Sequence, residues 1–273
     1  MIGGIGKIRP CGNSFIYKYA HAVTTADLNI INENRNKIPP EKDNFDFPLD
    51  NLENGNNAFK GLFSSIIIFN CPKLNQGYAF NYNQDQNGYY MPTFVKKVTF
   101  NAPQLTSANS GFQGCAGMTD FEGDLSSLKS GESFFNSCYL LKNININLSN
   151  LENGRLFFHM IPLETINLQT PKLSNGSGMF GSSLLDKKSA LTFINSLPSH
   201  SSGSHPLSIG IHIDHKYDPE VNVALKKLQN SYITPIEEVG GTLPEEITSF
   251  KGWTLTVQWN GTATENAYPQ PTE

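Results

Sequence analysis

Tyrosine and small polar residues gather in one stretch of the chain, "NQGYAFNYNQDQNGYYMPTF", residues 75–94. Tyrosine rings can stack on a sugar or a peptide, and amide and carboxylate groups can hydrogen-bond it. The same composition also suits a surface loop that binds nothing. We predict that five side chains of this stretch contact a ligand: Tyr82, Asn83, Asp85, Tyr89 and Tyr90.

Histidine and aspartate lie close together in "HIDH", His212 to His215. On a strand, His212 and Asp214 point to one face and offer two metal ligands, which a loop histidine, His200 or His205, could complete. The alternating isoleucines before them instead indicate a buried strand whose polar face carries His212 and Asp214 into solvent. We predict that no metal is bound, although the sequence leaves open whether His212, Asp214 and His215 bind one.

Catalytic motifs are not found in the sequence, which contains no GxSxG, no HExxH and no phosphate-binding loop. The acidic pairs 237–238 and 245–246 are sequence neighbours, whereas glycosidase carboxylates face each other across a cleft. Trp253 and Trp259 could stack on a sugar, but their alternation with Leu255 and Val257 favours a place in the core. We predict no catalytic residue, no cofactor and no enzymatic activity.

The charge and apolar content of the chain exclude further classes. Lys and Arg number 20 against 24 Asp and Glu, a net charge of −4, so the basic face that nucleic acid requires is not expected. No run of 18 apolar residues predicts a membrane span. The opening "MIGGIGKIRPCGNSF" lacks the apolar core of a secretion signal, so we expect a protein that the general export route does not carry, or one whose leader has been removed.

A repeat of 22–23 residues must position these groups. It appears first in "LENGNNAF" and "LENGRLFF", which begin at Leu52 and Leu151. Six leucines recur at spacings of 22, 31, 23, 23 and 22 residues, and a strand-like apolar residue stands seven positions before each of them. A Phe follows by seven positions, or by six after Leu74. The leucines are Leu52, Leu74, Leu105, Leu128, Leu151 and Leu173, the upstream residues are Phe45, Ile67, Val98, Phe121, Ile144 and Ile166, and the phenylalanines are Phe59, Phe80, Phe112, Phe135, Phe158 and Phe180.

This repeat predicts an α/β fold, a solenoid of the leucine-rich-repeat class with parallel strands and one short helical turn per unit. Cys71, Cys115 and Cys138 occupy positions where other units carry small or apolar residues, so we predict buried, reduced thiols. The 31-residue unit between Leu74 and Leu105 contains the tyrosine-rich insertion. Insertions of this kind map to loops, often on the binding face.

Units such as "LSSLKSGESFFNSCYLLKNI" and "NAPQLTSANSGFQGCAGMTDF" resemble the BspA-like leucine-rich repeats over residues 45–185, although the usual LxxLxLxxN phrase is absent. The later segments "KKSALTFINSLPS", "LSIGIHIDHK" and "KGWTLTVQWNG" are similar to the C-terminal region of leucine-rich-repeat proteins from gut bacteria and from their phages and prophages. The resemblance implies a stack of parallel strands in one sheet.

Four regions follow from these patterns. Residues 1–44 form an N-terminal arm and capping helix that orders against a partner, and residues 45–185 form the solenoid. Residues 186–262 form a small α/β cap, with a helix stopped by Pro198, a second helix opened by Asp218 and Pro219, and two strands. Residues 263–273 are predicted to be a disordered tail.

The expected function is non-enzymatic: a structural or adhesive component of a phage virion, in the tail or a fibre, that binds a host surface or a partner protein through the repeat face. The alternative is a bacterial cell-surface or extracellular adhesin that binds host protein or glycan, and a third is a hydrolase on a repeat scaffold. Expected partners are other virion or cell-surface proteins and a host-surface glycan or protein, and homo-oligomers are compatible with the sequence. Fold alone does not fix function.

Overall fold

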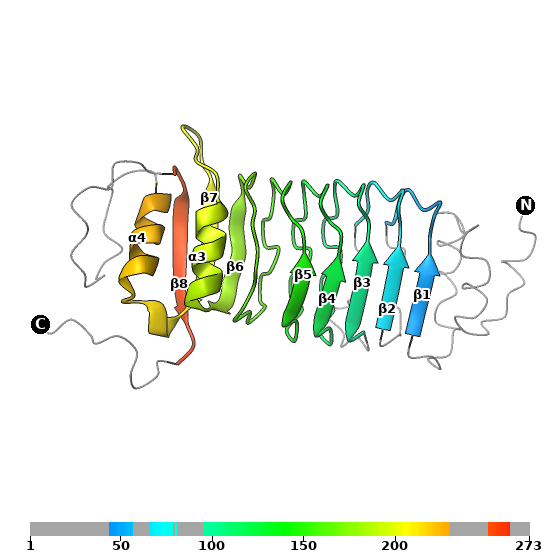
Figure 1. Cartoon of the computed structure of the whole chain (residues 1–273), viewed down its shortest axis with the longest axis horizontal. Coiled ribbons are helices and arrows are strands. Elements are labelled where there is room, and N and C mark those ends of the chain that lie inside the picture. The colour runs from blue at the N-terminus through cyan, green and yellow to red at the C-terminus, as the bar shows by residue number, and fades with distance from the viewer. Residues whose placement is uncertain (1–43, 57–65, 79, 81–94, 230–250, 263–273) are drawn as a thin grey trace, which may run out of the picture.

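The computed structural model describes residues 44–56, 66–78, 80, 95–229 and 251–262, with residues 44–48 described by their backbone. The chain is a mixed α/β protein, whose described residues form parallel strands in two sheets and few helices (Figure 1). The predicted N-terminal arm and the C-terminal tail lie outside the described residues, apart from Asn44. So does Phe59. Among the described residues, no helix has the length and apolar character that crossing a bilayer requires.

The first sheet contains five parallel strands in chain order. They are β1 (Asn44–Pro48), β2 (Ile66–Asn70), β3 (Lys97–Asn101), β4 (Asp120–Gly123) and β5 (Asn143–Ile146). The register pairs Ile67 with Val98, Val98 with Phe121, and Phe121 with Ile144. These are the positions that the sequence repeat aligned, so the predicted strand register is confirmed.

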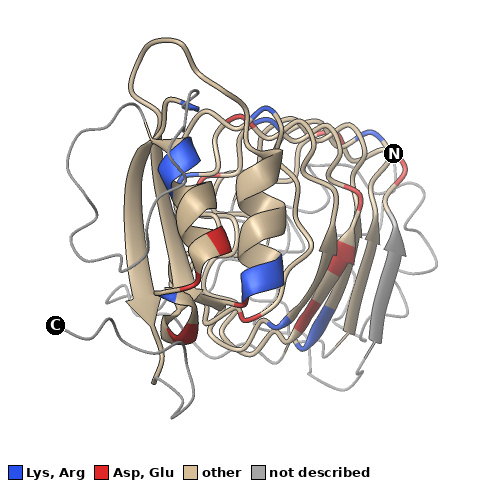
Figure 2. Cartoon of the chain, turned by 60° about the vertical axis from the view of Figure 1, so that its left-hand side comes forward, with Lys and Arg blue, Asp and Glu red and all other residues tan. Residues whose placement is uncertain are grey.

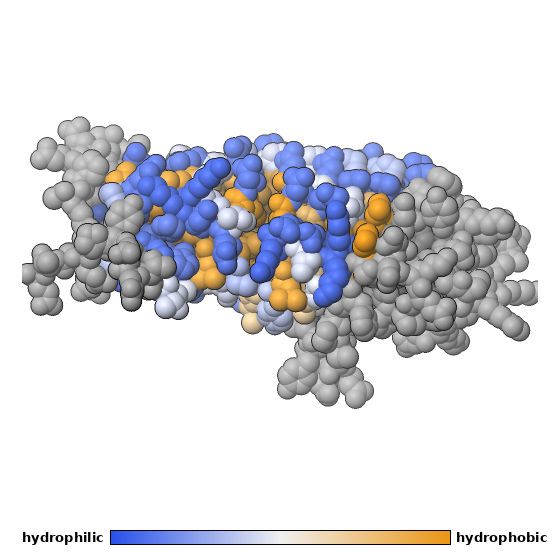
Figure 3. Space-filling model, turned by 60° about the horizontal axis from the view of Figure 1, so that its bottom comes forward, coloured by the Kyte–Doolittle hydropathy of each residue, from blue (hydrophilic) through white to orange (hydrophobic). Residues whose placement is uncertain are grey.

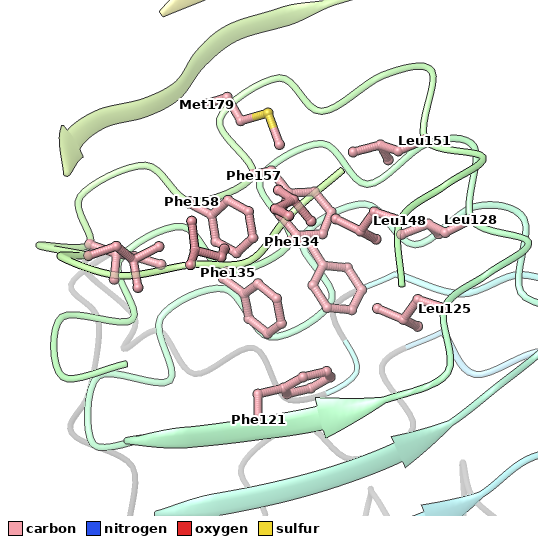
Figure 4. Close-up of a cluster of buried hydrophobic side chains, with 14 of the residues drawn as sticks. Phe121, Leu125, Leu128, Phe134, Phe135, Leu148, Leu151, Phe157, Phe158 and Met179 are labelled. Carbon is pink, nitrogen blue, oxygen red and sulfur yellow. The ribbon is translucent and has the colours of Figure 1, made fainter. Parts of the chain in front are cut away.

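A second row of contacts runs beside the sheet, two residues after each anchor leucine. Single parallel bridges join Asn54 to Gln76 and continue, repeat by repeat, to Asn153 and Asn175. All six anchor leucines are fully buried. Phenylalanine rings of successive repeats stack behind them, with centroids 5.7 Å apart for Phe135 and Phe158 (Figure 4). The spacing of the sequence repeat therefore places its apolar residues in one continuous core.

After Leu105, Leu128 and Leu151, where the following stretch is described in full, the expected helical turn does not form. The stretch consists of turns, in which backbone N–H groups are donated sideways to the next repeat: Ser110 N to Glu132 O at 2.7 Å, and Phe112 N to Phe134 O at 2.8 Å. Two residues have positive φ in each of the repeats that begin at Leu105, Leu128 and Leu151, such as Ser110 (54°) and Gly114 (75°). A left-handed residue interrupts a right-handed helix, so repeated left-handed positions explain why turns replace it.

The strand expected around Ile166 is also absent, since residues 161–170 form no strand. The backbone N–H of Ile166 donates to Ser189 Oγ at 2.9 Å, and that of Thr170 donates to Ser196 Oγ at 3.0 Å. Both serines belong to the helix that follows. Helix hydroxyls therefore take bonds that a strand would have given to its neighbour in the sheet.

The second sheet contains three parallel strands, β6 (Gly176–Leu185), β7 (Pro206–His212) and β8 (Thr254–Asn260), in that order. The helices α3 (Lys187–Ser196) and α4 (Pro219–Leu228) lie on one face of it (Figure 1). The predicted end of α3 before Pro198 and the predicted start of α4 at Asp218 are confirmed. Residues after Leu173 form β6 instead of another turn, so the sixth repeat contributes a strand to the second sheet.

Polar contacts tie the two helices together at their starts. Asp218 caps α4 by accepting hydrogen bonds from the N–H groups of Glu220 and Val221. Its other carboxylate oxygen lies 3.0 Å from Lys187 Nζ, which also lies 2.9 Å from Glu220 Oε2. Hydrogen bonds to Glu220 and Asp218 raise the pKa of Lys187 above its ordinary range. The ammonium of Lys187 is thus fully engaged between the helices.

Trp253 and the cysteines have the buried positions that the sequence predicts. Trp253 is 1% exposed and donates from its indole nitrogen to Pro198 O at 3.0 Å, whereas Trp259 is only partly buried against the core. Cys71, Cys115 and Cys138 are buried free thiols.

Candidate ligand-binding groove

The residues that sequence patterns singled out do not come together in the described part of the chain. Tyr82, Asn83, Asp85, Tyr89 and Tyr90 lie outside the described residues. The histidine motif is described, and its geometry differs from the prediction.

Strand β7 ends at His212, and Ile213–His215 form a 3-10 turn, so His212 and Asp214 do not share a strand face. His212 Nδ1 accepts a hydrogen bond from the backbone N–H of Asp214 at 3.4 Å and lies 3.4 Å from Asp214 Oδ2. The motif is therefore a local turn that the histidine ring caps.

His200 and His205 cannot complete a site with His212. They stack on each other with ring centroids 3.5 Å apart, and Trp253 packs on His200 at 4.8 Å. His205 precedes the start of β7 and His212 ends it, a separation of about 20 Å at the rise of a strand. Within the described ranges, no three His, Cys, Asp or Glu side chains are placed to hold a metal ion.

A groove of about 630 Å³ lies on the open face of the first sheet, beside α3. Its floor is formed by β3, β4, β5 and the segment 165–167, and the first two turns of α3 form one wall. The lining residues are Lys97, Asp120, Phe121, Glu122, Lys142, Asn143, Ile144, Asn145, Thr165, Ile166, Asn167, Asp186, Lys188, Ser189 and Thr192.

Strand register arranges the floor in rows. One row across β3, β4 and β5 consists of Lys97, Asp120 and Asn143. A second row consists of Thr99, Glu122 and Asn145. Acidic and basic segments appear on strands of the first sheet, and a basic segment appears at the start of a helix (Figure 2). With the lower edge of the molecule turned forward, hydrophilic side chains cover much of the described surface and separate small hydrophobic patches (Figure 3).

The carboxylates of the groove are engaged within the protein. Asp120 accepts hydrogen bonds from Thr119 Oγ1 and Asn143 Nδ2, both at 2.6 Å. These two bonds, that from Thr119 first, hold the pKa of Asp120 below its ordinary value. Glu122 accepts a hydrogen bond from Thr99 Oγ1 at 2.8 Å and lies 3.7 Å from Lys97 Nζ. Asp186 caps α3 by accepting from Ser189 N at 2.7 Å.

Six other polar side chains of the groove are available to a ligand. Within the described part of the chain they make no side-chain hydrogen bond and no ion pair, and five of them are exposed. They are Lys142, Asn145, Thr165, Asn167, Lys188 and the half-buried Thr192. Two ammonium groups, two amides and two hydroxyls can hydrogen-bond a ligand, and they offer more donors than acceptors.

Sequence reasoning missed this groove, although part of its signal is present. The polar residues of the floor recur eight and six positions before the anchor leucines, as Asp120 and Glu122 do before Leu128. The contribution of α3 has no counterpart in the repeat, because it depends on how the second sheet packs beside the first.

No protein-family model, no curated protein and no solved structure matches the chain. The residues and contacts of the groove itself are therefore the basis for the proposed function.

Proposed function

We propose that the chain is a leucine-rich-repeat solenoid of the BspA-like type with a small α/β C-terminal cap, and that it acts as a non-enzymatic binding module. The register of β1 to β5 supports the solenoid, since each of the first five sequence repeats adds one strand at the same position. The row of single bridges from Asn54 to Asn175 supports it as well.

The binding role is supported by a difference between two sets of polar side chains in the groove: the carboxylates have partners within the protein, and the available polar side chains named above have none among the described residues. Asp120 and Glu122, which could serve a hydrolase as acid and base, are held by neighbouring side chains. Asn145, Asn167 and the other available groups line the open groove without a side-chain partner among the described residues. Groups of this kind bind and orient a ligand without transferring protons to it. This arrangement favours recognition over the repeat-scaffold hydrolase.

In this proposal the protein is a structural or adhesive part of a phage virion, in the tail or a fibre, that meets a host surface through the repeat face. The support for a phage setting is the resemblance of residues 186–262 to proteins of gut bacteria, phages and prophages. A bacterial cell-surface adhesin would use the same groove, and the BspA-like repeats favour that alternative. Tyr82, Asn83, Asp85, Tyr89 and Tyr90 remain proposed as additional contacts.

Binding of the labelled chain to a panel of intact gut anaerobes tests the proposal. Three variants are compared with the parent: Asn145→Ala with Asn167→Ala in the groove, a deletion of residues 81–90, and Gln104→Ala with Asn195→Ala as exposed amides outside the groove. We expect strain-selective binding that the groove variant loses and the control keeps. Binding that survives the groove variant would show that recognition lies elsewhere, and absence of binding to every strain would refute the adhesive role.

A further inference from the structure

We propose that the groove binds an acidic saccharide, with the anionic group of the sugar between Lys142 and Lys188 and its hydroxyls on Asn145 and Asn167. This inference rests on the proposed binding function and names its ligand class.

The charged groups of the groove differ in whether they already have partners. Three lysines and three acidic residues line the groove, which makes its formal charge zero. Asp120, Glu122 and Asp186 are already bonded by side chains or backbone of the protein, and Lys97 faces Glu122. Lys142 and Lys188 have no such partner among the described residues. Asp120 and Asp186 stay anionic, since their hydrogen bonds come from neutral groups, but those bonds occupy carboxylate oxygens. An anion entering the groove therefore meets two ammonium groups that form no ion pair within the described part of the chain and can bind it.

The two lysines lie at the same end of the groove. Lys142 immediately precedes β5, and Lys188 belongs to the first turn of α3. The hydrogen bond from Ile166 N to Ser189 Oγ fixes that turn beside Thr165 and Ile166. Lys187, next along the helix, is held by Asp218 and Glu220 and does not reach the groove as a free charge. The proposed anion-binding site thus lies at the end of the groove where the parallel strands begin.

The floor suits hydroxyl groups better than peptide side chains. Asn145, Thr165, Asn167 and Thr192 present amides and hydroxyls, which can both donate to and accept from sugar hydroxyls. Phe121 is 2% exposed and Ile166 is 7% exposed, so they offer no pocket for the apolar anchor residues that peptide grooves hold. A volume of about 630 Å³ lies in the range of small-ligand sites. Nucleic acid would need a continuous basic stripe, which the intervening carboxylates interrupt.

Isothermal titration calorimetry of the full chain tests the inference. The probes are tetragalacturonate, 3′-sialyllactose and a phosphorylated mannotriose as acidic saccharides, maltotetraose as a neutral one, and tetraglutamate as an acidic peptide. We expect at least one acidic saccharide to bind, maltotetraose to bind at least tenfold more weakly, and tetraglutamate not to compete. The carboxylate and phosphate probes separate the two sources of negative charge.

Two pairs of lysine variants localise the site. Lys142→Gln with Lys188→Gln should weaken acidic-saccharide binding at least tenfold, while Lys129→Gln with Lys226→Gln, at exposed or partly exposed positions outside the groove lining, should leave it unchanged. Thermal unfolding of each variant verifies the fold. Equal binding by both variants, tighter binding of maltotetraose or tetraglutamate, or no binding of any acidic probe would each overturn the inference.

The cell assay separates this failure from failure of the proposed function. If Asn145→Ala with Asn167→Ala abolishes cell binding but no acidic saccharide binds or competes, the binding role stands and the ligand class is wrong. If no cell is bound, the binding role itself fails.

Discussion

The position that a Cβ atom of Gly131 would occupy lies 2.5 Å from Cε2 of Phe157, a residue of the next repeat. The ring of Phe157 is fixed from its other sides by Phe134, at 5.2 Å, and by Phe158, at 4.7 Å, between centroids. Gly131 stands three residues after the anchor Leu128. Glycine there lets a ring from the neighbouring repeat lie directly against the backbone, which brings the repeats into close contact.

Gly131→Ala should lower the free energy of unfolding by about 1–3 kcal/mol, because the added methyl group overpacks a core that has no free volume for it. Urea denaturation of the variant and the parent measures the loss. In Gly131→Ala with Phe157→Leu the two effects should be less than additive, since the smaller side chain makes room for the methyl. Strict additivity would mean that the two residues do not touch.

The anchor leucines provide a broader test of the repeat. Leu128 and Leu151 are fully buried, so Leu128→Ala or Leu151→Ala should each cost about 2–5 kcal/mol through lost burial and the cavity left behind. Lys129→Ala, one position further along and exposed, should stay within about 0.5 kcal/mol of the parent. A loss of less than about 0.5 kcal/mol at either leucine would show that the assigned register is wrong.

Left-handed backbone positions recur five and nine residues after Leu105, Leu128 and Leu151. Gly114 (φ 75°) and Met160 (φ 60°) occupy the same place in two repeats, and Met160 is 40% exposed. Gly114→Ala should lower the unfolding free energy by about 1 kcal/mol, since a side chain in this conformation is strained. Met160→Gly should raise it by up to about 1 kcal/mol, because relief of strain exceeds the entropy that glycine loses on folding. Opposite signs in thermal unfolding are the expected result, and equal signs would contradict it.

The sequence predicted the strand register, but not the missing strand of the sixth repeat or the turns. The strand register followed from the positions of Ile67, Val98, Phe121 and Ile144, because an apolar residue stands seven positions before the anchor leucine in each of these repeats. The missing strand at Ile166 could not be predicted, since its N–H is taken by Ser189, a residue with no place in the repeat. The turns that replace the expected helices depend on backbone N–H groups donated between repeats, and single-repeat patterns carry no information about them.

The candidate site was less predictable for a related reason. Asn145 and Asn167 occupy outward-facing positions of the repeat, and their spacing from Leu151 and Leu173 is visible in the sequence. Asn145 and Asn167 matter because their side chains have no hydrogen-bond partner among the described residues, whereas Asp120 and Glu122 do. That difference depends on the packed structure.

The buried cysteines should resist oxidation and alkylation in the native state. Burial, followed by the hydrogen bond with Cys138, raises the pKa of the Cys115 thiol well above its ordinary value. Cys138 Sγ donates to Phe112 O at 3.1 Å. Because the thiolate is the reactive species, both groups should react with a thiol reagent only on unfolding. In a Cys11→Ser background, mass spectrometry should find no modified cysteine in native protein and three in urea. A Cys115–Cys138 disulfide in untreated protein would contradict this prediction.

Two histidines should make stability depend on pH. Desolvation lowers the pKa of His159, and desolvation followed by the neighbouring His205 lowers that of His200, in each case from an ordinary value of 6.5. A histidine whose pKa is depressed by folding binds fewer protons in the folded state than in the unfolded state. The contribution of these two histidines to the unfolding free energy should therefore be constant above pH 6.5. Below pH 6.5, the unfolding free energy should fall as the pH decreases.

Thermal unfolding between pH 7.5 and pH 5 measures this slope, and the readout is the slope itself and not the absolute melting temperature. His200→Gln and His159→Gln should each flatten it, whatever they do to stability at pH 7.5. Asp120 does not contribute in this range, because its lowered pKa makes its effect appear only below the ordinary carboxyl value of 3.8. A slope that both histidine variants leave unchanged would assign the pH dependence to other groups.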